Sequence, residues 1–144
     1  MTASSSWFMW AVWSAVFAAL TAIFAKVGLQ GVNSDLATLV RTVIILAVLS
    51  AFVACTGAWR NPFALSARTW CFLGLSGLAT GASWVCYFRA LQAGEASKVA
   101  PVDKLSIVLV ALFAFAFLGE RPNLREWTGI ALVAGGLVLL ALRR

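Results

Sequence analysis

Charged side chains beside long apolar runs are the residues of this sequence that could do chemistry. Arg89 directly follows the apolar stretch 84–88, and Asp103 and Lys104 follow Pro101 at the start of another apolar run. Ionisable groups at membrane depth are energetically costly, so they usually face a partner or a water-filled cavity. Their positions therefore indicate side chains that face a charged partner or a water-filled cavity.

Asp103 is the acidic residue that comes nearest to membrane depth, and its short side chain cannot reach far toward the membrane surface. One interpretation pairs Asp103 with Lys104, Arg89 or Arg41, and the other makes it the carrier of a coupled proton. Lys26 and Arg41 have long side chains that can instead extend their charged heads to the membrane interface. Asp103 can therefore be an ion-pair partner or a proton carrier, and Lys26 and Arg41 can reach the interface or face a partner or cavity. These alternatives stay open at this point.

Aromatic residues accompany these charges. Trp84 and Tyr87 are three residues apart, so they share one face of a helix and could line a cavity beside Arg89; packing in the core is the alternative. Trp13 lies deeper in the first apolar run than an interfacial aromatic belt explains. We predict that Trp13, Arg41, Trp84, Tyr87, Arg89 and Lys104 bind substrate and that Asp103 is the candidate for proton coupling.

The sequence gives little support for catalysis. It has no His, which removes the usual general base and the commonest metal ligand. It also has no cluster of carboxylates and no phosphate-binding glycine loop. Cys55, Cys71 and Cys86 are an odd number, lie in apolar runs and form no C-x-x-C pair, so they indicate small buried hydrophobes. We expect no enzymatic activity, no cofactor and no metal.

The composition is that of a membrane protein. Of the 144 residues, 62% are hydrophobic and 11% charged, whereas soluble domains are about 45–50% apolar and about 25% charged. The net charge of +6 is explained by Lys and Arg in short loops, which membrane proteins commonly carry, so we expect no nucleic-acid partner. Unbroken apolar runs rich in Ala, Leu and Val favour helices over the alternating pattern of membrane strands.

About 20 apolar residues make one helical crossing, so the chain has room for five or six. Uncharged runs predict an all-α, polytopic protein with five transmembrane helices in a single domain, residues 1–144. The predicted helices cover about residues 7–26, 36–58, 69–91, 99–119 and 126–142. The first apolar run is too long for the core of a signal peptide, so we expect it to be a retained helix.

In loops and the C-terminal tail, Lys and Arg are nearly balanced between the two sides of the predicted membrane topology. One side has Arg60, Arg68, Arg121 and Arg125 in its loops, and the other has Lys98, Arg143 and Arg144. This second side also has four cations that lie at or inside helix ends and are not counted here: Lys26, Arg41, Arg89 and Lys104. Orientation normally follows the side richer in these residues. A balance this even is what a chain that inserts in both orientations needs.

Three segments in the second half of the sequence carry a family resemblance. They are Ala96-Ser97-Lys98-Val99-Ala100-Pro101, then Leu118-Gly119-Glu120-Arg121-Pro122, then the glycine-bearing run from Trp127 to Gly136. Together with the helices before them, they resemble the EamA domain of the drug/metabolite transporter superfamily over about residues 7–142. The chain is similar to the short, five-helix bacterial and archaeal branch, one half of the ten-helix fold of most relatives.

The resemblance implies a transporter of small metabolites in the cytoplasmic membrane of a prokaryote, in contact with membrane lipids. It also implies a cavity among the first four helices and alternating access by two halves of opposite orientation, so that a lone half needs a second copy. We therefore expect an antiparallel homodimer with dual topology. Two alternatives stay open: a flippase for a lipid-linked or amphiphilic substrate, and a non-transporting accessory membrane subunit.

Charge around the expected cavity favours an anionic or zwitterionic substrate. On that side of the membrane, cationic residues outnumber acidic ones even without the C-terminal tail. The cations are Lys26, Arg41, Arg89, Lys98 and Lys104, and the acids are Asp35, Glu95 and Asp103. A cationic mouth raises the local concentration of anions.

Overall fold

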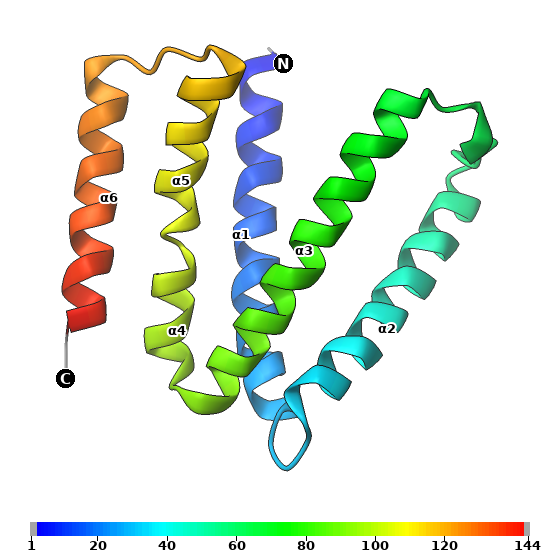
Figure 1. The fold of residues 1–144 in the computed structure, drawn as a ribbon, viewed down its shortest axis with the longest axis horizontal. Coiled ribbons are helices and arrows are strands. Elements are labelled where there is room, and N and C mark those ends of the chain that lie inside the picture. The colour runs from blue at the N-terminus through cyan, green and yellow to red at the C-terminus, as the bar shows by residue number, and fades with distance from the viewer. Residues whose placement is uncertain (1–2, 143–144) are drawn as a thin grey trace. The chain divides into compact units, whose positions relative to one another are not determined.

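The computed structural model describes residues 3–142, and Arg143 and Arg144, counted above in the charge balance, lie outside them. Helices dominate this part of the chain (Figure 1). In chain order the elements are α1 (Ala3–Gly28), α2 (Ser34–Cys55), the 3-10 turn η1 (Pro62–Ala64), α3 (Ala67–Ala93), α4 (Ala96–Asp103), α5 (Ser106–Phe113), the π-helical turn η2 (Ala114–Leu118) and α6 (Leu124–Leu142).

Five segments are long and apolar enough to cross a membrane: Ser6–Gly28, Ser34–Cys55, Ala67–Ala93, Ala96–Leu118 and Leu124–Leu142. The prediction of an all-α, polytopic fold with five membrane-crossing segments is confirmed. The fourth segment combines α4, α5 and η2. The prediction of a single domain stays a prediction, since contacts divide the chain into two compact units, one formed by Phe24–Ala93 and one by residues 3–23 with 94–142.

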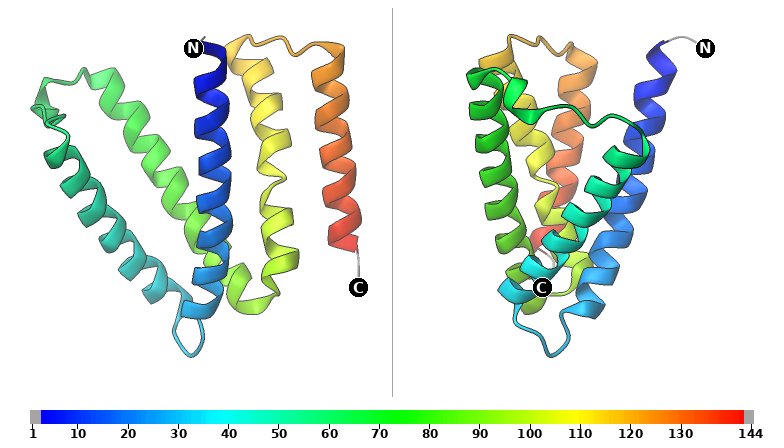
Figure 2. Two further views of the ribbon diagram at one scale, coloured as in Figure 1. Left: turned by 180° about the vertical axis from the view of Figure 1, so that it is seen from behind. Right: turned by 90° about the vertical axis from the view of Figure 1, so that its right-hand side faces the viewer.

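The unit Phe24–Ala93 is an antiparallel hairpin of α2 and α3 together with the last turn of α1 (Figure 2). Its helices meet where α3 ends, and Leu29, Phe88 and Leu91 are buried there. Asn33 starts α2, because its side-chain oxygen accepts hydrogen bonds from the backbone N–H groups of Asp35 and Leu36, at 2.9 and 3.2 Å. This cap fixes the direction in which α2 leaves the loop.

In the other unit, α6 lies alongside both α4 and α5, as Figures 1 and 2 show. The sequence predicted one helix over 99–119, which is wrong in detail, because α4 ends at Asp103 and α5 begins at Ser106. Backbone bonds of the i to i+3 type mark the break: Lys104 N–H donates to Pro101 O at 2.9 Å, and Leu105 N–H to Val102 O at 3.0 Å.

Pro101 lies inside α4, three residues before the break at Lys104. Proline has no N–H to donate to the carbonyl four residues earlier, and its ring crowds that carbonyl. The chain tightens to the 3-10 pattern just after Pro101, and a 3-10 stretch inside a long helix often marks a functional hinge. The break at Lys104 and Leu105 lies within the membrane-crossing segment Ala96–Leu118.

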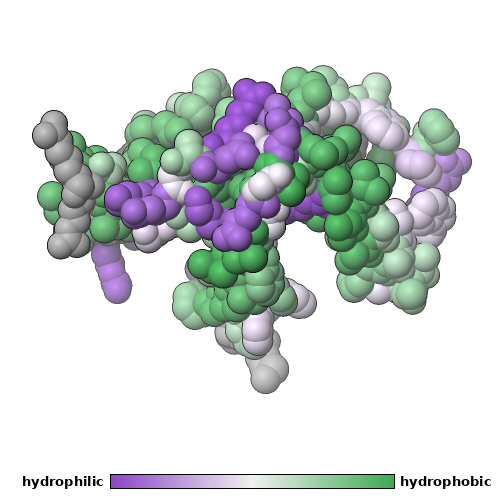
Figure 3. Space-filling model, turned by 90° about the horizontal axis from the view of Figure 1, so that it is seen from below, coloured by the Kyte–Doolittle hydropathy of each residue, from purple (hydrophilic) through white to green (hydrophobic). Residues whose placement is uncertain are grey.

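The outer surface of the helices is hydrophobic. In the most apolar stretch of each membrane-crossing segment, at most 6% of residues are buried within the chain. The space-filling view shows hydrophobic residues along the helices and hydrophilic residues gathered at the helix ends that face the viewer (Figure 3). Lipid or another protein subunit must cover so much exposed apolar surface.

Candidate functional site

Arg41 of α2 is held against aromatic rings of α3. Its guanidinium carbon lies 4.3 Å from the centre of the Trp84 ring and 5.2 Å from that of Phe88. Trp84 and Phe88 are four residues apart, so both rings project from the same face of α3 toward α2. Cation–π attraction of this kind contributes about 0.5–2 kcal/mol, more as the site is desolvated.

The charge of Arg41 is not balanced by a carboxylate. Among residues 3–142, no acidic side chain forms a salt bridge with Arg41, although the residue is half-buried inside a membrane-crossing helix. The aromatic rings hold the guanidinium plane but accept none of its five N–H donors in the way a carboxylate does. Arg41 therefore presents a positioned cation that can bind an anion.

Arg89, by contrast, is engaged with Asp35. Its Nε and one terminal nitrogen donate to the two carboxylate oxygens of Asp35 at 2.9 and 2.8 Å. This bidentate geometry is the strongest form of an arginine–carboxylate pair. The pair joins the C-terminal part of α3 to the first turn of α2, so the structure places Arg89 in a contact between helices.

Two further bonds hold the same end of the hairpin. The Lys26 ammonium donates to the carbonyl of Leu91 at 2.6 Å, and Gln92 Nε2 donates to the carbonyl of Val32 at 2.8 Å. Lys26 thus binds a carbonyl in the last turn of α3, where a helix favours positive charge. The ammonium of Lys26 is held within the protein rather than only extended to the membrane surface.

Replacing Arg89 with Gln is expected to lower the thermal unfolding midpoint by a few degrees, because it removes a bidentate pair that joins two helices. The same change at Lys98, whose salt bridge with Glu95 at 3.1 Å joins neighbours on one helix, is expected to have a smaller effect. Thermal unfolding of the two detergent-purified variants measures both midpoints. Equal midpoints for the Arg89 variant and the wild-type protein would contradict the structural role of the pair.

Asp103 and Lys104 form an ion pair at the break in the fourth segment. The Lys104 ammonium lies 3.4 Å from a carboxylate oxygen of Asp103. Of the partners considered for Asp103 from the sequence, the structure brings Lys104 to it, while Arg89 pairs with Asp35. A pair of opposite charges thus sits where the helix is interrupted.

Two further predicted residues, Trp13 and Tyr87, each lie beside an aromatic ring. Trp13 of α1 is 54% exposed, with its ring 6.3 Å from that of Phe17. Tyr87 is half-buried, and its ring centre lies 6.4 Å from that of Phe88. The substrate-binding role predicted for Trp13, Arg41, Trp84, Tyr87, Arg89 and Lys104 stays a prediction, but Arg41 and Trp84 do come together.

Phe88 and the pairing partner of Arg89 were missed from the sequence. Phe88 is nearly fully buried and follows Trp84 by one helical turn, a spacing that could have indicated a two-ring platform. Asp35 comes two residues after the cap residue Asn33, so the sequence could indicate that Asp35 lies in the first turn of a helix. The sequence could not indicate that its partner is in α3. Within residues 3–142, no group of three His, Cys, Asp or Glu side chains could hold a metal ion.

Comparison with known proteins gives a consistent picture. Residues 5–142 match the EamA-like transporter family. An "Uncharacterized transporter in cobO 3'region" from Sinorhizobium sp is 62% identical over 138 residues, which cover 96% of this chain and 98% of that protein. A "Probable 4-amino-4-deoxy-L-arabinose-phosphoundecaprenol flippase subunit ArnE" from Yersinia pestis (strain Pestoides F) is 31% identical over 84 residues, 58% of this chain and 74% of that protein. No solved structure matches.

Proposed function

Because the chain belongs to the EamA-like transporter family, we propose that it is a subunit of a transporter for a small anionic or zwitterionic metabolite. It works by alternating access in the cytoplasmic membrane, and its bacterial relatives support that location. The observation that carries the choice of substrate charge is Arg41, a cation within a membrane-crossing helix with no carboxylate partner in the described part of the chain.

An unpaired charge in a membrane-crossing segment is costly to maintain, and such residues commonly mark substrate pathways. A substrate carboxylate or phosphate can offset this cost, because the planar guanidinium binds two oxygens of either group through two parallel hydrogen bonds. Trp84 and Phe88 contribute by holding the guanidinium in one orientation. Arg41 with Trp84 is therefore our proposed anion-binding element, and the roles of Trp13, Tyr87, Arg89 and Lys104 stay predictions.

Uptake into liposomes that contain the purified protein tests this function. We expect radiolabelled carboxylates or amino acids to accumulate faster in these liposomes than in protein-free ones. No protein-dependent uptake of any small solute would favour the accessory-subunit alternative and contradict the proposal.

A flippase is the second candidate, and the similarity to a protein named as a flippase subunit favours it. An amphiphilic anion would use the same cation at Arg41, with an apolar tail left in the membrane. Mass spectrometry of the purified protein separates the two functions. Copurification of one lipid-linked anion, together with no uptake of water-soluble solutes, would select the flippase.

The proposed assembly is an antiparallel homodimer. The chain supplies five membrane-crossing segments, and alternating access in transporters with inverted repeats requires two halves of opposite orientation. In the described part of the chain, a Cβ added at Gly77 or Gly81 of α3, or at Gly135 of α6, would meet no atom within 4 Å other than those of the adjacent backbone of its own helix. Small residues let membrane helices approach closely, so these open faces suit a second copy.

Dual insertion predicts that a cysteine placed between Arg60 and Arg68 is labelled in about half of the molecules. The reagent must not cross membranes, the cells must be intact, and the protein must lack Cys55, Cys71 and Cys86. About half is expected because nearly balanced Lys and Arg give little orientational preference. Labelling of nearly all or nearly none of the molecules would exclude dual insertion.

A further inference from the structure

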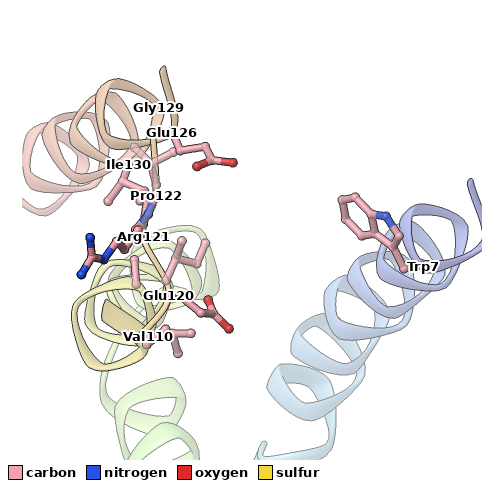
Figure 4. Close-up of a pocket in the computed structure, with 12 residues that line it drawn as sticks. Trp7, Val110, Glu120, Arg121, Pro122, Glu126, Gly129 and Ile130 are labelled. Carbon is pink, nitrogen blue, oxygen red and sulfur yellow. The ribbon is translucent and has the colours of Figure 1, made fainter. Parts of the chain in front are cut away.

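A cleft of about 920 Å³ lies in the unit made by residues 3–23 and 94–142. Its walls come from α5, η2 and α6, with Trp7 of α1 on its other side (Figure 4). The wall residues are mainly apolar, including Ile107, Val110, Ile130 and Val133. Three charged residues also line the cleft. Glu120 and Arg121 belong to the segment that links η2 to α6, and Glu126 belongs to the first turn of α6.

Local helix-end chemistry places the first carboxylate. Gly119 adopts a left-handed conformation with φ of 70°, which ends η2 and is unfavourable for residues with a side chain. The N–H of Glu120 then reaches back to the carbonyl of Ala114 at 3.3 Å. This closing of the helix leaves Glu120 at the rim of the cleft, and within residues 3–142 no cation forms a salt bridge with it.

A capping box places the second carboxylate. The N–H of Asn123 donates to a carboxylate oxygen of Glu126 at 2.6 Å, and the N–H of Glu126 donates to Oδ1 of Asn123 at 2.9 Å. These reciprocal bonds fix Glu126 in the first turn of α6 and leave its second oxygen for a ligand. In Figure 4 the carboxylates of Glu120 and Glu126 both point to the side on which Trp7 lies.

We propose that this cleft binds a phospholipid whose head carries a primary amine, with an acyl chain along the apolar wall. The ammonium group lies at Glu120 and Glu126, which accept its hydrogen bonds, and the indole of Trp7 adds an aromatic surface on which a cation is favourable. Arg121 also lines the cleft, but in Figure 4 its guanidinium points away from the carboxylates of Glu120 and Glu126, so these two carboxylates set the charge that faces the ammonium group. The proposal is independent of the transported substrate.

Charge complementarity selects this lipid over other occupants. An anionic lipid would place its net charge beside two carboxylates, and a choline head has no N–H to donate to them. A water-soluble amine would leave the apolar wall of the cleft uncovered. A lipid with an amine head satisfies the apolar wall and the charged rim together.

Lipid titration of the detergent-purified protein, read by native mass spectrometry, tests the proposal. Dioleoyl phosphatidylethanolamine is expected to bind about tenfold more tightly than the choline or glycerol analogue, since only its head donates charge-assisted hydrogen bonds from an ammonium group to the two carboxylates. The double variant Glu120→Gln, Glu126→Gln is expected to lose this preference. Gln at position 126 preserves the capping box, so the variant keeps its helix start.

Glu95→Gln is the matched control, because Glu95 pairs with Lys98 and does not line the cleft. It is expected to keep the preference for phosphatidylethanolamine. Equal binding of the three lipids to the wild-type protein, or an unchanged preference in the double variant, would overturn the proposal. A third outcome would also overturn the proposal: the double variant no longer forms dimers, and the wild-type protein shows no preference among the three lipids. That result would indicate that a second copy of the chain occupies the cleft.

Discussion

Replacing Arg41 with Gln is expected to reduce uptake of an anionic solute by about 10- to 100-fold. The expected size follows from the loss of charge-assisted hydrogen bonds, which contribute about 1.5–3 kcal/mol. Arg41 forms no salt bridge within residues 3–142, so the variant leaves no buried carboxylate without its partner and is expected to fold. Uptake into liposomes and the unfolding midpoint of the same preparation give the two readouts.

Arg68 supplies a matched control for this variant. Its guanidinium carbon lies 5.9 Å from the ring centre of Phe72, so it is another arginine beside an aromatic ring of α3, near the opposite end of that helix. Arg68→Gln is expected to leave uptake unchanged. Arg41→Lys keeps the charge but loses the planar fork, and is expected to retain partial uptake with weaker affinity. Full uptake by Arg41→Gln would remove Arg41 from the binding site.

Replacing Asp103 with Asn is expected to abolish the dependence of uptake on a pH gradient. If transport is coupled to protons, protonation of Asp103 neutralises the partner of Lys104 at the break between α4 and α5 and weakens the pair that lies there. Asn has nearly the same shape but cannot carry a proton. Uptake with an imposed pH gradient should therefore fall to the level measured without one.

Glu95→Gln is the control for Asp103, because it removes the other acidic residue of an ion pair near α4. It is expected to preserve uptake driven by the gradient. Gradient-driven uptake by Asp103→Asn at the wild-type level would exclude Asp103 as the proton carrier.

The membrane-crossing segments were predictable because each is a long apolar run bounded by charges or turn residues. The interruption of the fourth segment was not predicted. Pro101 lies within the apolar run, and the sequence alone does not say whether a proline merely bends a helix or divides it. The backbone bonds after Pro101 show that the helix is divided at Lys104 and Leu105.

The candidate site was predictable in its residue types but not in its pairings. Arg41 was chosen as a charge beside an apolar run and Trp84 for sharing a helix face with Tyr87. The contact between Arg41 and Trp84 depends on how α2 and α3 are aligned along each other. The same alignment brings Arg89 and Asp35 together in a salt bridge, which the sequence could not indicate. Gly77 and Gly81 have the G-x-x-x-G spacing at which membrane helices approach closely, but the described chain places no other element against either glycine.

The charge preference of the protein is measured by the uptake of three solutes of similar size into liposomes that contain the wild-type protein: a carboxylate, an amino acid and an alkylamine. We expect protein-dependent uptake of the carboxylate or the amino acid and none of the amine, because the positioned charge at Arg41 is positive. Uptake of the amine alone would contradict this expectation.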